Sequence, residues 1–400
     1  MIVEKEDALL PRLPRLMVLL FAIAAGLAVA NVYYAQPMLH LMAAEFGIPK
    51  GSAGIIVTVT QIGYGLGLLL IVPLGDVLNR RKLISGQMLL SAVALILIGF
   101  AHHRFVFFIG MILLGLLAVV TQVLVAYSAT LAAPSERGRV VGLVTSGIVV
   151  GILLARTVSG TMADLGGWRS VYFLSAGLTL ILTGILMKVL PGADQHKTST
   201  SYPKLLISMF RLFATEPLLL IRSLIAMFLF AAFSTLWTAL VLPLSAPPIS
   251  LSSTEIGLFG LVGVLGTLGA TKAGQLADRG KAQWTTGIAL SLLLLSWLSI
   301  GFTESSLWAL VLGIIILDLA VQAVHVTNQS MIYTLQPEAR SRIVAGYMIF
   351  YSIGSGVGSI TATKVFAAAG WTGVCLLGAG FSLLALLFWL LTRKYSKAKL

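Results

Sequence analysis

The chain has 400 residues, of which 58% are hydrophobic and only 10% are charged, and its formal net charge is +13. Soluble domains carry about 25% charged residues because water must solvate their surface, so this composition excludes an ordinary soluble protein. The excess of basic residues is the one bulk feature that points towards nucleic acid.

Apolar stretches long enough to cross a membrane recur along the whole sequence. A span needs ~20 apolar residues to cross a hydrocarbon core of ~30 Å. The first stretch also fits a signal peptide ending at Ala28-Val29-Ala30, but cleavage there would leave eleven spans. The sequence predicts an all-α membrane protein with twelve transmembrane helices, at 16–41, 53–74, 83–101, 105–132, 140–163, 170–190, 218–244, 254–276, 284–302, 307–335, 343–366 and 373–391.

The basic residues lie almost entirely on one side of these spans. Of the 27 Lys and Arg, 21 fall in the tails and loops of one side, four on the other side, and two, Arg156 and Arg222, within spans. This is the positive-inside pattern of a membrane protein. It argues against nucleic-acid binding, and it predicts that both termini are cytoplasmic.

One long polar stretch divides the spans into two sets of six. Residues 191–217 are predicted to form a cytoplasmic linker, with a short amphipathic helix at 204–213. The predicted domains are an N-terminal six-helix bundle over 1–190 and a C-terminal six-helix bundle over 218–400.

The two halves carry matching motifs at a constant distance. The pattern Pro-x-x-Arg-x-Arg-x-Val begins at residue 134 and again at residue 337, and Gly-Trp at 167–168 recurs at 370–371, so both offsets are 203 positions. Such repeats predict a duplicated six-helix unit, which is typical of transporters that rock about a site at the membrane midplane.

Two loops carry an acidic residue followed by a cluster of basic residues, at 73–82 and at 274–281. In these loops the chain resembles the major facilitator superfamily, whose fold is two homologous six-helix bundles. The resemblance implies alternating access by a working monomer, with Asp76 capping the start of the eleventh helix near Ile343. It also implies a set of gating residues: Asp76, Arg80, Arg81, Asp278 and Arg279. The alternative is an ordinary basic loop.

The segments 31–37, 154–160 and 318–329 resemble the bacterial arabinose-efflux and multidrug-efflux permeases. Two positions depart from the drug-antiporter pattern. Met111 stands where those antiporters usually carry an arginine in the fourth helix, and Arg156 stands where a proline is expected in the fifth. Proton-linked export by the usual residues is therefore not predicted.

Of the 14 Asp and Glu, Asp318 alone lies deep inside a predicted span. His325 follows seven residues later on the same helical face, with Gln322 between them. A buried charge costs at least ~2.5 kcal/mol at a span centre, so such groups are candidates for function. We expect Asp318 and His325 to carry protons, and the alternative is a polar stripe that only holds helices together.

Arg156 is the other deep charge. It is expected to bind an anionic substrate, to pair with Asp318, or to lock the two halves together, because a buried arginine needs an anion in at least one state. Arg222 lies five residues after Pro217, so snorkelling to the cytoplasmic interface is expected.

Polar and aromatic residues on the first, fourth, seventh and tenth helices complete the candidate substrate site, because the resemblance implies that the first, fourth and seventh line the central cavity. The full substrate-binding set is Asn31, Tyr34, Gln122, Tyr127, Arg156, Trp237, Gln322 and Asn328.

The sequence predicts a transporter and not an enzyme. It contains no phosphate-cradling loop, no cofactor motif, and one cysteine, Cys375, which excludes an intrachain disulfide and a paired-Cys metal site. The predicted function is export of a small organic molecule across a bacterial inner membrane in exchange for protons. The alternatives are an importer or uniporter of a sugar or anionic metabolite and, in another class, an intramembrane enzyme or receptor.

Overall fold

A computed structural model describes residues 13–133, 135–192, 201–336 and 339–394, without the side chains of 265–272 and 277–278. Within those ranges the regular elements are all helices. The polypeptide is an all-α membrane protein of the predicted class.

The N-terminal half crosses the bundle six times. The crossings are formed by α2 (Arg15–Tyr33) with η1 (Gln36–Met38) and α3 (Leu39–Glu45); η2 (Lys50–Ser52) with α4 (Ile55–Leu70) and η3 (Val72–Asp76); α5 (Arg80–Gly99); α6 (Arg104–Ala118) with α7 (Val120–Leu131); α8 (Arg137–Gly166); and α9 (Arg169–Val189).

The C-terminal half repeats this arrangement after a short connecting helix, α10 (Tyr202–Thr215). Its crossings are formed by α11 (Pro217–Ala239) with α12 (Val241–Leu244); α13 (Ser253–Leu276) with η4 (Ala277–Lys281); α14 (Ala282–Ile300); α15 (Leu307–Ile332); and the two parts of α16 (Arg340–Thr392).

The helix α16 has 53 residues because it joins two crossings end to end. The chain turns at Gly370, whose φ of 62° lies in the left-handed region that favours glycine. Ten described segments are long and apolar enough to span a membrane, with α16 counted once and α13 as a shorter apolar helix. Dividing α16 at Gly370 and adding α13 gives the twelve predicted spans.

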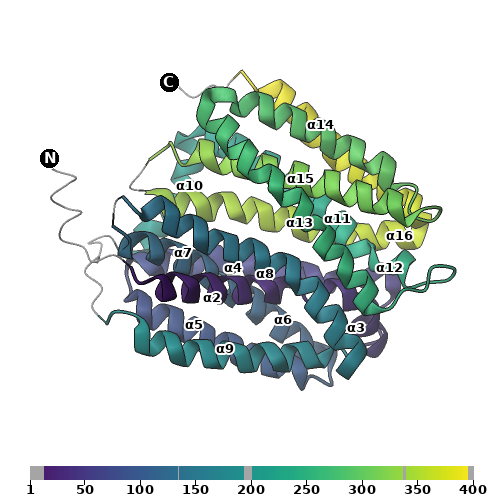
Figure 1. Cartoon of the computed structure of the whole chain (residues 1–400), viewed down its shortest axis with the longest axis horizontal. Coiled ribbons are helices and arrows are strands. Elements are labelled where there is room, and N and C mark those ends of the chain that lie inside the picture. Colours follow the sequence, from purple (N-terminus) through teal and green to yellow (C-terminus); the bar gives the residue numbers. More distant parts are fainter. Residues whose placement is uncertain (1–12, 134, 193–200, 337–338, 395–400) are drawn as a thin grey trace.

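Figure 1 shows the two halves side by side, with the purple-to-teal helices of the first against the green-to-yellow helices of the second. We call the end that carries Asp76, Arg80 and Arg340 the basic end, and the end that carries Glu45 and Ser253 the opposite end. The short helix α10 lies at the basic end and buries one face through Leu205, Met209 and Leu212, at helical spacing. The amphipathic helix expected at 204–213 is therefore present.

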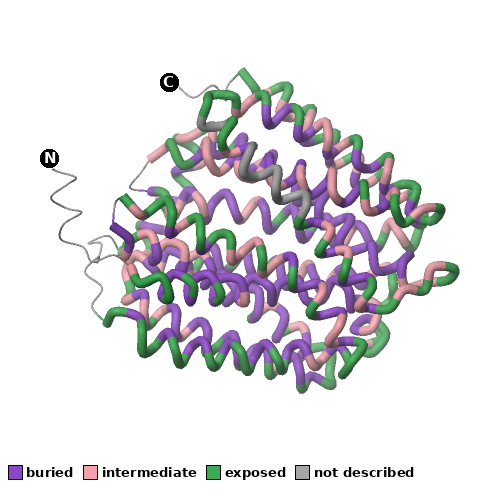
Figure 2. Tube along the Cα trace, viewed as in Figure 1, coloured by how far each residue is buried: buried purple, intermediate pink, exposed green. Residues whose placement is uncertain are grey.

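The halves meet along two pairs of helices, α8 with α13 and α4 with the first part of α16. Glycines permit this contact at the opposite end: a methyl group on Gly160 would lie 2.1 Å from the Ser253 carbonyl oxygen, and one on Gly54 would lie 2.1 Å from that of Ser359. The most buried span is α11, with 83% of its apolar window inside the protein, against 39% for α9. In Figure 2, buried residues lie mostly on the inner helices of the bundle, whereas the outer helix α9 alternates between buried and exposed residues.

The inner packing of the C-terminal half generates a stability prediction. A methyl group on Gly378 would lie 2.0 Å from the Trp297 ring, whereas Gly380, on the same helix, has nothing within 4 Å. Overpacking costs about 1–3 kcal/mol. We expect Gly378→Val to lower the thermal unfolding midpoint in detergent, and Gly380→Val to leave it unchanged; equal midpoints for both variants would contradict this packing.

Candidate functional site

Two opposite charges lie close together in the middle of the bundle, and they come from different halves. Arg156 of α8 is 2% exposed and Asp318 of α15 is 5% exposed. Asp318 is the only carboxylate in the buried class among the residues whose side chains are described. The prediction that it is the deep acid of the chain holds for that part of the structure.

Arg156 is held by polar and aromatic neighbours. Its Nε donates a hydrogen bond of 2.8 Å to Oε1 of Gln36 in η1, and its guanidinium lies 3.8 Å from the centroid of the Trp237 ring. The rings of Tyr33 and Phe233 are 5.2 Å and 5.6 Å away. Nη2 is buried without a hydrogen-bond partner, so the site leaves one donor of a buried cation free. A cavity of about 10 Å³ adjoins it, which is room for about one water.

Asp318 accepts a hydrogen bond from Trp237, and a glycine on the facing helix leaves space for its carboxylate. Nε1 of Trp237 donates to Oδ1 of Asp318 at 3.4 Å. A methyl group on Gly263 of α13 would lie 2.2 Å from the other carboxylate oxygen, so only glycine leaves room for this carboxylate. A purely sequence-based argument could not find that contact, because it depends on how α13 packs against α15.

An aromatic layer separates this charged layer from the basic end. The hydroxyl groups of Tyr33 in the N-terminal half and Tyr351 in the C-terminal half are hydrogen-bonded across the interface. Tyr64 packs edge-on against Tyr351, and Gln122 donates to the Tyr64 hydroxyl at 3.4 Å. These contacts join the two halves between Arg156 and the basic end.

On the basic-end side of that layer, a cavity of about 600 Å³ opens between the halves. It is lined from both halves, by Gln122, Asp76 and Arg80 on one side and by Tyr333 and Arg340 on the other. A larger hollow, of about 1050 Å³, lies against α2 and α8. Its lining comes almost entirely from the N-terminal half and includes seven exposed apolar side chains, Leu19, Ile23, Leu143, Val150, Leu154, Val158 and Leu178. We therefore assign the site to the interface between the halves.

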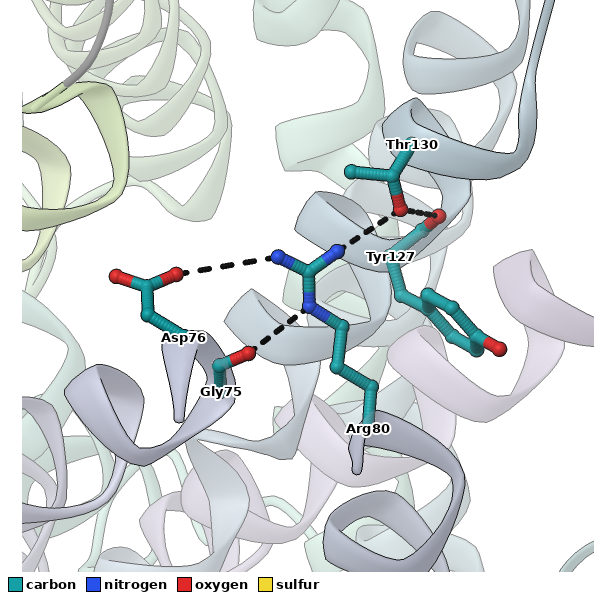
Figure 3. Close-up of polar contacts among 5 residues, drawn as sticks. All are labelled: Gly75, Asp76, Arg80, Tyr127 and Thr130. Carbon is teal, nitrogen blue, oxygen red and sulfur yellow. Dashed lines mark hydrogen bonds and ion pairs between the residues drawn. The ribbon is translucent and has the colours of Figure 1, made fainter. Parts of the chain in front are cut away.

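The loop that carries Asp76 is ordered around Arg80 (Figure 3). Arg80 donates to the Gly75 carbonyl oxygen at 3.0 Å and to Oγ1 of Thr130 at 2.9 Å, and its Nη2 lies 3.8 Å from Oδ1 of Asp76. Thr130 in turn donates to the Tyr127 carbonyl oxygen at 2.8 Å. This loop is therefore fixed to α7 of its own half, while capping of the eleventh helix by Asp76 stays a prediction.

His325 belongs to a separate polar cluster nearer the basic end. Its Nδ1 lies 2.9 Å from the Tyr347 hydroxyl, and Asn328 donates a hydrogen bond of 3.4 Å to the same hydroxyl. The seven residues between Asp318 and His325 correspond to ~10 Å of helix. The two expected proton carriers are thus on one helix but not in contact.

The expectation that Arg222 snorkels to the interface is wrong. Arg222 is fully buried, and its Nη1 donates to Oγ1 of Thr286 at 3.2 Å and to Oδ1 of Asn328 at 3.3 Å. Its Nε and Nη2 are buried without a partner. The proximity of Pro217 suggested access to solvent, but α14, α15 and α16 surround this side chain.

The other predicted site residues are dispersed. Asn31 accepts a hydrogen bond of 2.7 Å from Ser175 within the N-terminal half, and Tyr34 packs edge-on against Tyr172. Tyr127 donates to the Pro191 carbonyl oxygen at 3.5 Å.

Four predicted residues remain. Gln322 is half-buried, Arg279 is exposed, and the side chain of Asp278 lies outside the described residues. Arg81 donates to the Met187 carbonyl oxygen.

The opposite end is closed by contacts that the sequence did not suggest. Asp164, near the end of α8, accepts hydrogen bonds from the backbone N–H groups of Ser253 and Thr254, at 3.2 Å and 2.7 Å, and from the Thr254 hydroxyl at 2.6 Å. A carboxylate of one half thus caps the first turn of α13 in the other half. Gly54 adds a backbone donor to Oγ1 of Thr363 at 3.1 Å.

With this geometry established, comparison with known proteins gives the family. A model of the Major Facilitator Superfamily matches residues 21–335 and 224–400. The chain belongs to the Major Facilitator Superfamily. It is 47% identical over 373 residues to the putative uncharacterized transporter YgaY of Escherichia coli strain K12, covering 93% of this chain and 94% of that protein.

More distant relatives and solved structures agree in fold. The multidrug resistance protein MdtG of Klebsiella pneumoniae strain 342 is 22% identical, over 86% of this chain and 85% of its own length. A bacterial homologue of the human lysosomal transporter Spinster, inward-facing and unoccupied, superposes with a TM-score of 0.73 at 16% identity, over 95% of each chain. The nucleoside transporter NupG gives 0.74 at 15% identity, over 94% of this chain and 99% of its own.

These comparisons confirm the predicted superfamily and the prediction that the chain is a multi-pass membrane transporter and not an enzyme. The narrower resemblance to arabinose-efflux permeases stays a prediction.

The Asp164 cap predicts how the opposite end opens. An N-cap contact contributes about 1 kcal/mol. Removing it should therefore raise the fraction of molecules that are open at the opposite end about fivefold. In a Cys375→Ser background, a cysteine introduced at the buried Ser359 should react faster with a water-soluble maleimide when Asp164→Ala is added. Glu45→Ala is the control, because Glu45 pairs with Arg169 inside one half. An unchanged labelling rate in Asp164→Ala would contradict a closing role.

Proposed function

We propose that this member of the superfamily is a proton-coupled secondary transporter of a small organic solute, with Asp318 as its proton site. The observation that carries the proposal is the burial of this one carboxylate between the halves, within reach of Trp237 and near Arg156. A carboxylate in such a place gains or loses a proton only when a conformational change gives it access to one side.

The arrangement of contacts supports alternating access. The opposite end is sealed by Asp164 and Gly54, while a cavity is open at the basic end. We propose that the basic end is cytoplasmic in a bacterial inner membrane, because the positive-inside pattern favours it. His325 is proposed as a second protonatable group.

We propose export in exchange for protons as the first direction to test, because relatives named multidrug resistance protein support it. A second candidate, uptake of an anionic metabolite, is favoured by Arg156. Its free Nη2 is a buried donor, and protonation of Asp318 would leave the guanidinium without a nearby negative charge, so that an anion would bind there together with a proton.

Asp318→Asn tests the proton site. In inside-out vesicles with an acidic interior, a panel of drugs, sugars and organic anions is added while a dye reports the pH gradient. We expect some compound to dissipate the gradient with the wild type and not with Asp318→Asn, because an amide cannot release a proton. Glu304→Gln, at an exposed carboxylate, should behave as the wild type. Gradient dissipation that is equal in Asp318→Asn and wild type would exclude Asp318.

Arg156→Gln tests the second candidate. Truncating one partner of a buried charge pair costs at least ~2 kcal/mol, so we expect Arg156→Gln to weaken the competition of organic anions by at least ~30-fold and that of neutral compounds much less. Arg156→Lys, which keeps the charge, should retain part of the affinity. Equal losses for anions and neutral compounds would assign Arg156 a structural role instead.

A further inference from the structure

Trp237 touches both charges of the central layer. The guanidinium of Arg156, from the N-terminal half, lies 3.8 Å from its ring centroid, and Asp318, on α15 of the C-terminal half, accepts its indole N–H at 3.4 Å. Among the described contacts no ion pair joins Arg156 directly to Asp318. One indole side chain therefore contacts both the buried cation of one half and the buried anion of the other.

An indole suits this position because its two surfaces have opposite polarity. The ring face carries negative potential and attracts a cation, while the N–H edge donates to an anion. A low-dielectric interior lets one interaction polarise the next. Loss of the negative charge on Asp318 weakens the hydrogen bond at the edge, and it also removes the nearby anion that favours Arg156 against the face.

We propose that Trp237 is the positioning residue that couples protonation of Asp318 to the contact between the two halves. This inference rests on the proposed function, in which Asp318 is the proton site. The sequence placed Trp237 in the substrate-binding set, as part of a cavity wall; the contacts give it a role in coupling that a phenylalanine of similar shape could not perform.

The other titratable groups near Asp318 come from several helices. Arg156 faces it from α8. Tyr33 of α2 lies beside Arg156, and its hydroxyl is hydrogen-bonded to that of Tyr351 in α16. His325 lies ~10 Å along α15, and α13 contributes Gly263 at the point of contact. Within the described side chains, then, Asp318 is the only carboxylate whose protonation can change the Trp237 contact directly.

The test measures conformation against pH and needs no transported solute. Spin labels are placed at two exposed positions of the basic end, Ser135→Cys in the first half and Thr334→Cys in the second, in a Cys375→Ser background. Double electron–electron resonance on the full chain in lipid nanodiscs then gives the distribution of distances between the two labels as the pH is lowered.

Trp237→Phe retains the aromatic face and removes the N–H donor. We expect the wild type to show a pH-dependent change in these distances, and we expect Trp237→Phe to lose that change although Asp318 is intact. The matched control is Trp297→Phe, because Trp297 is equally buried and donates its N–H to Ser382 at 3.0 Å inside one half. That control should keep the wild-type response.

The outcomes separate this inference from the proposed function. A wild-type pH response in Trp237→Phe, with none in Asp318→Asn, would overturn the coupling role of Trp237 and leave Asp318 as the proton site. A wild-type response in Asp318→Asn would overturn the proposed proton site itself. Loss in both, with a normal Trp297→Phe, is the result expected.

Discussion

The structure depends on placing one cation and one anion in a medium that penalises both. A buried ion loses several kcal/mol of hydration, and in this protein the compensation is divided between two bundles, with Arg156 in one and Asp318 in the other. Neither bundle is electrically balanced alone at this depth. The layer is therefore most stable when the halves are together, and any change in the charge of Asp318 acts on the interface and not only on one helix.

The remaining contacts lie on either side of this layer, along the direction in which the helices run. Towards the basic end lie the hydrogen-bonded tyrosines and then the open cavity; towards the opposite end lie the glycine contacts and the Asp164 cap. The charged layer is thus enclosed on both sides while one end of the molecule is open. A solute moving from the open cavity to the charged layer would have to pass the tyrosines, so the aromatic layer lies where an inner gate would be.

The sequence was sufficient for what depends on position along a helix. Apolar length predicted twelve spans, the 203-residue repeat predicted two halves, and depth within a span predicted that Asp318 is buried. It was insufficient for what depends on rotation about a helix and on neighbours. Arg222 was assigned to the interface by its nearness to Pro217, and Asp164 was passed over as a residue near the end of a span, because periodicity does not say which helix a side chain faces.

The glycine contacts at the opposite end affect how easily the halves separate. Gly54 and Gly160 meet the backbone of the other half directly, so closing the halves there does not order a long side chain. The side-chain conformational entropy therefore changes little when this end opens or closes. Parting these surfaces uncovers mainly peptide groups, which water can solvate. These glycine contacts can therefore open and close repeatedly at a low free-energy cost. The few charged contacts beside them then determine which of the two states is favoured.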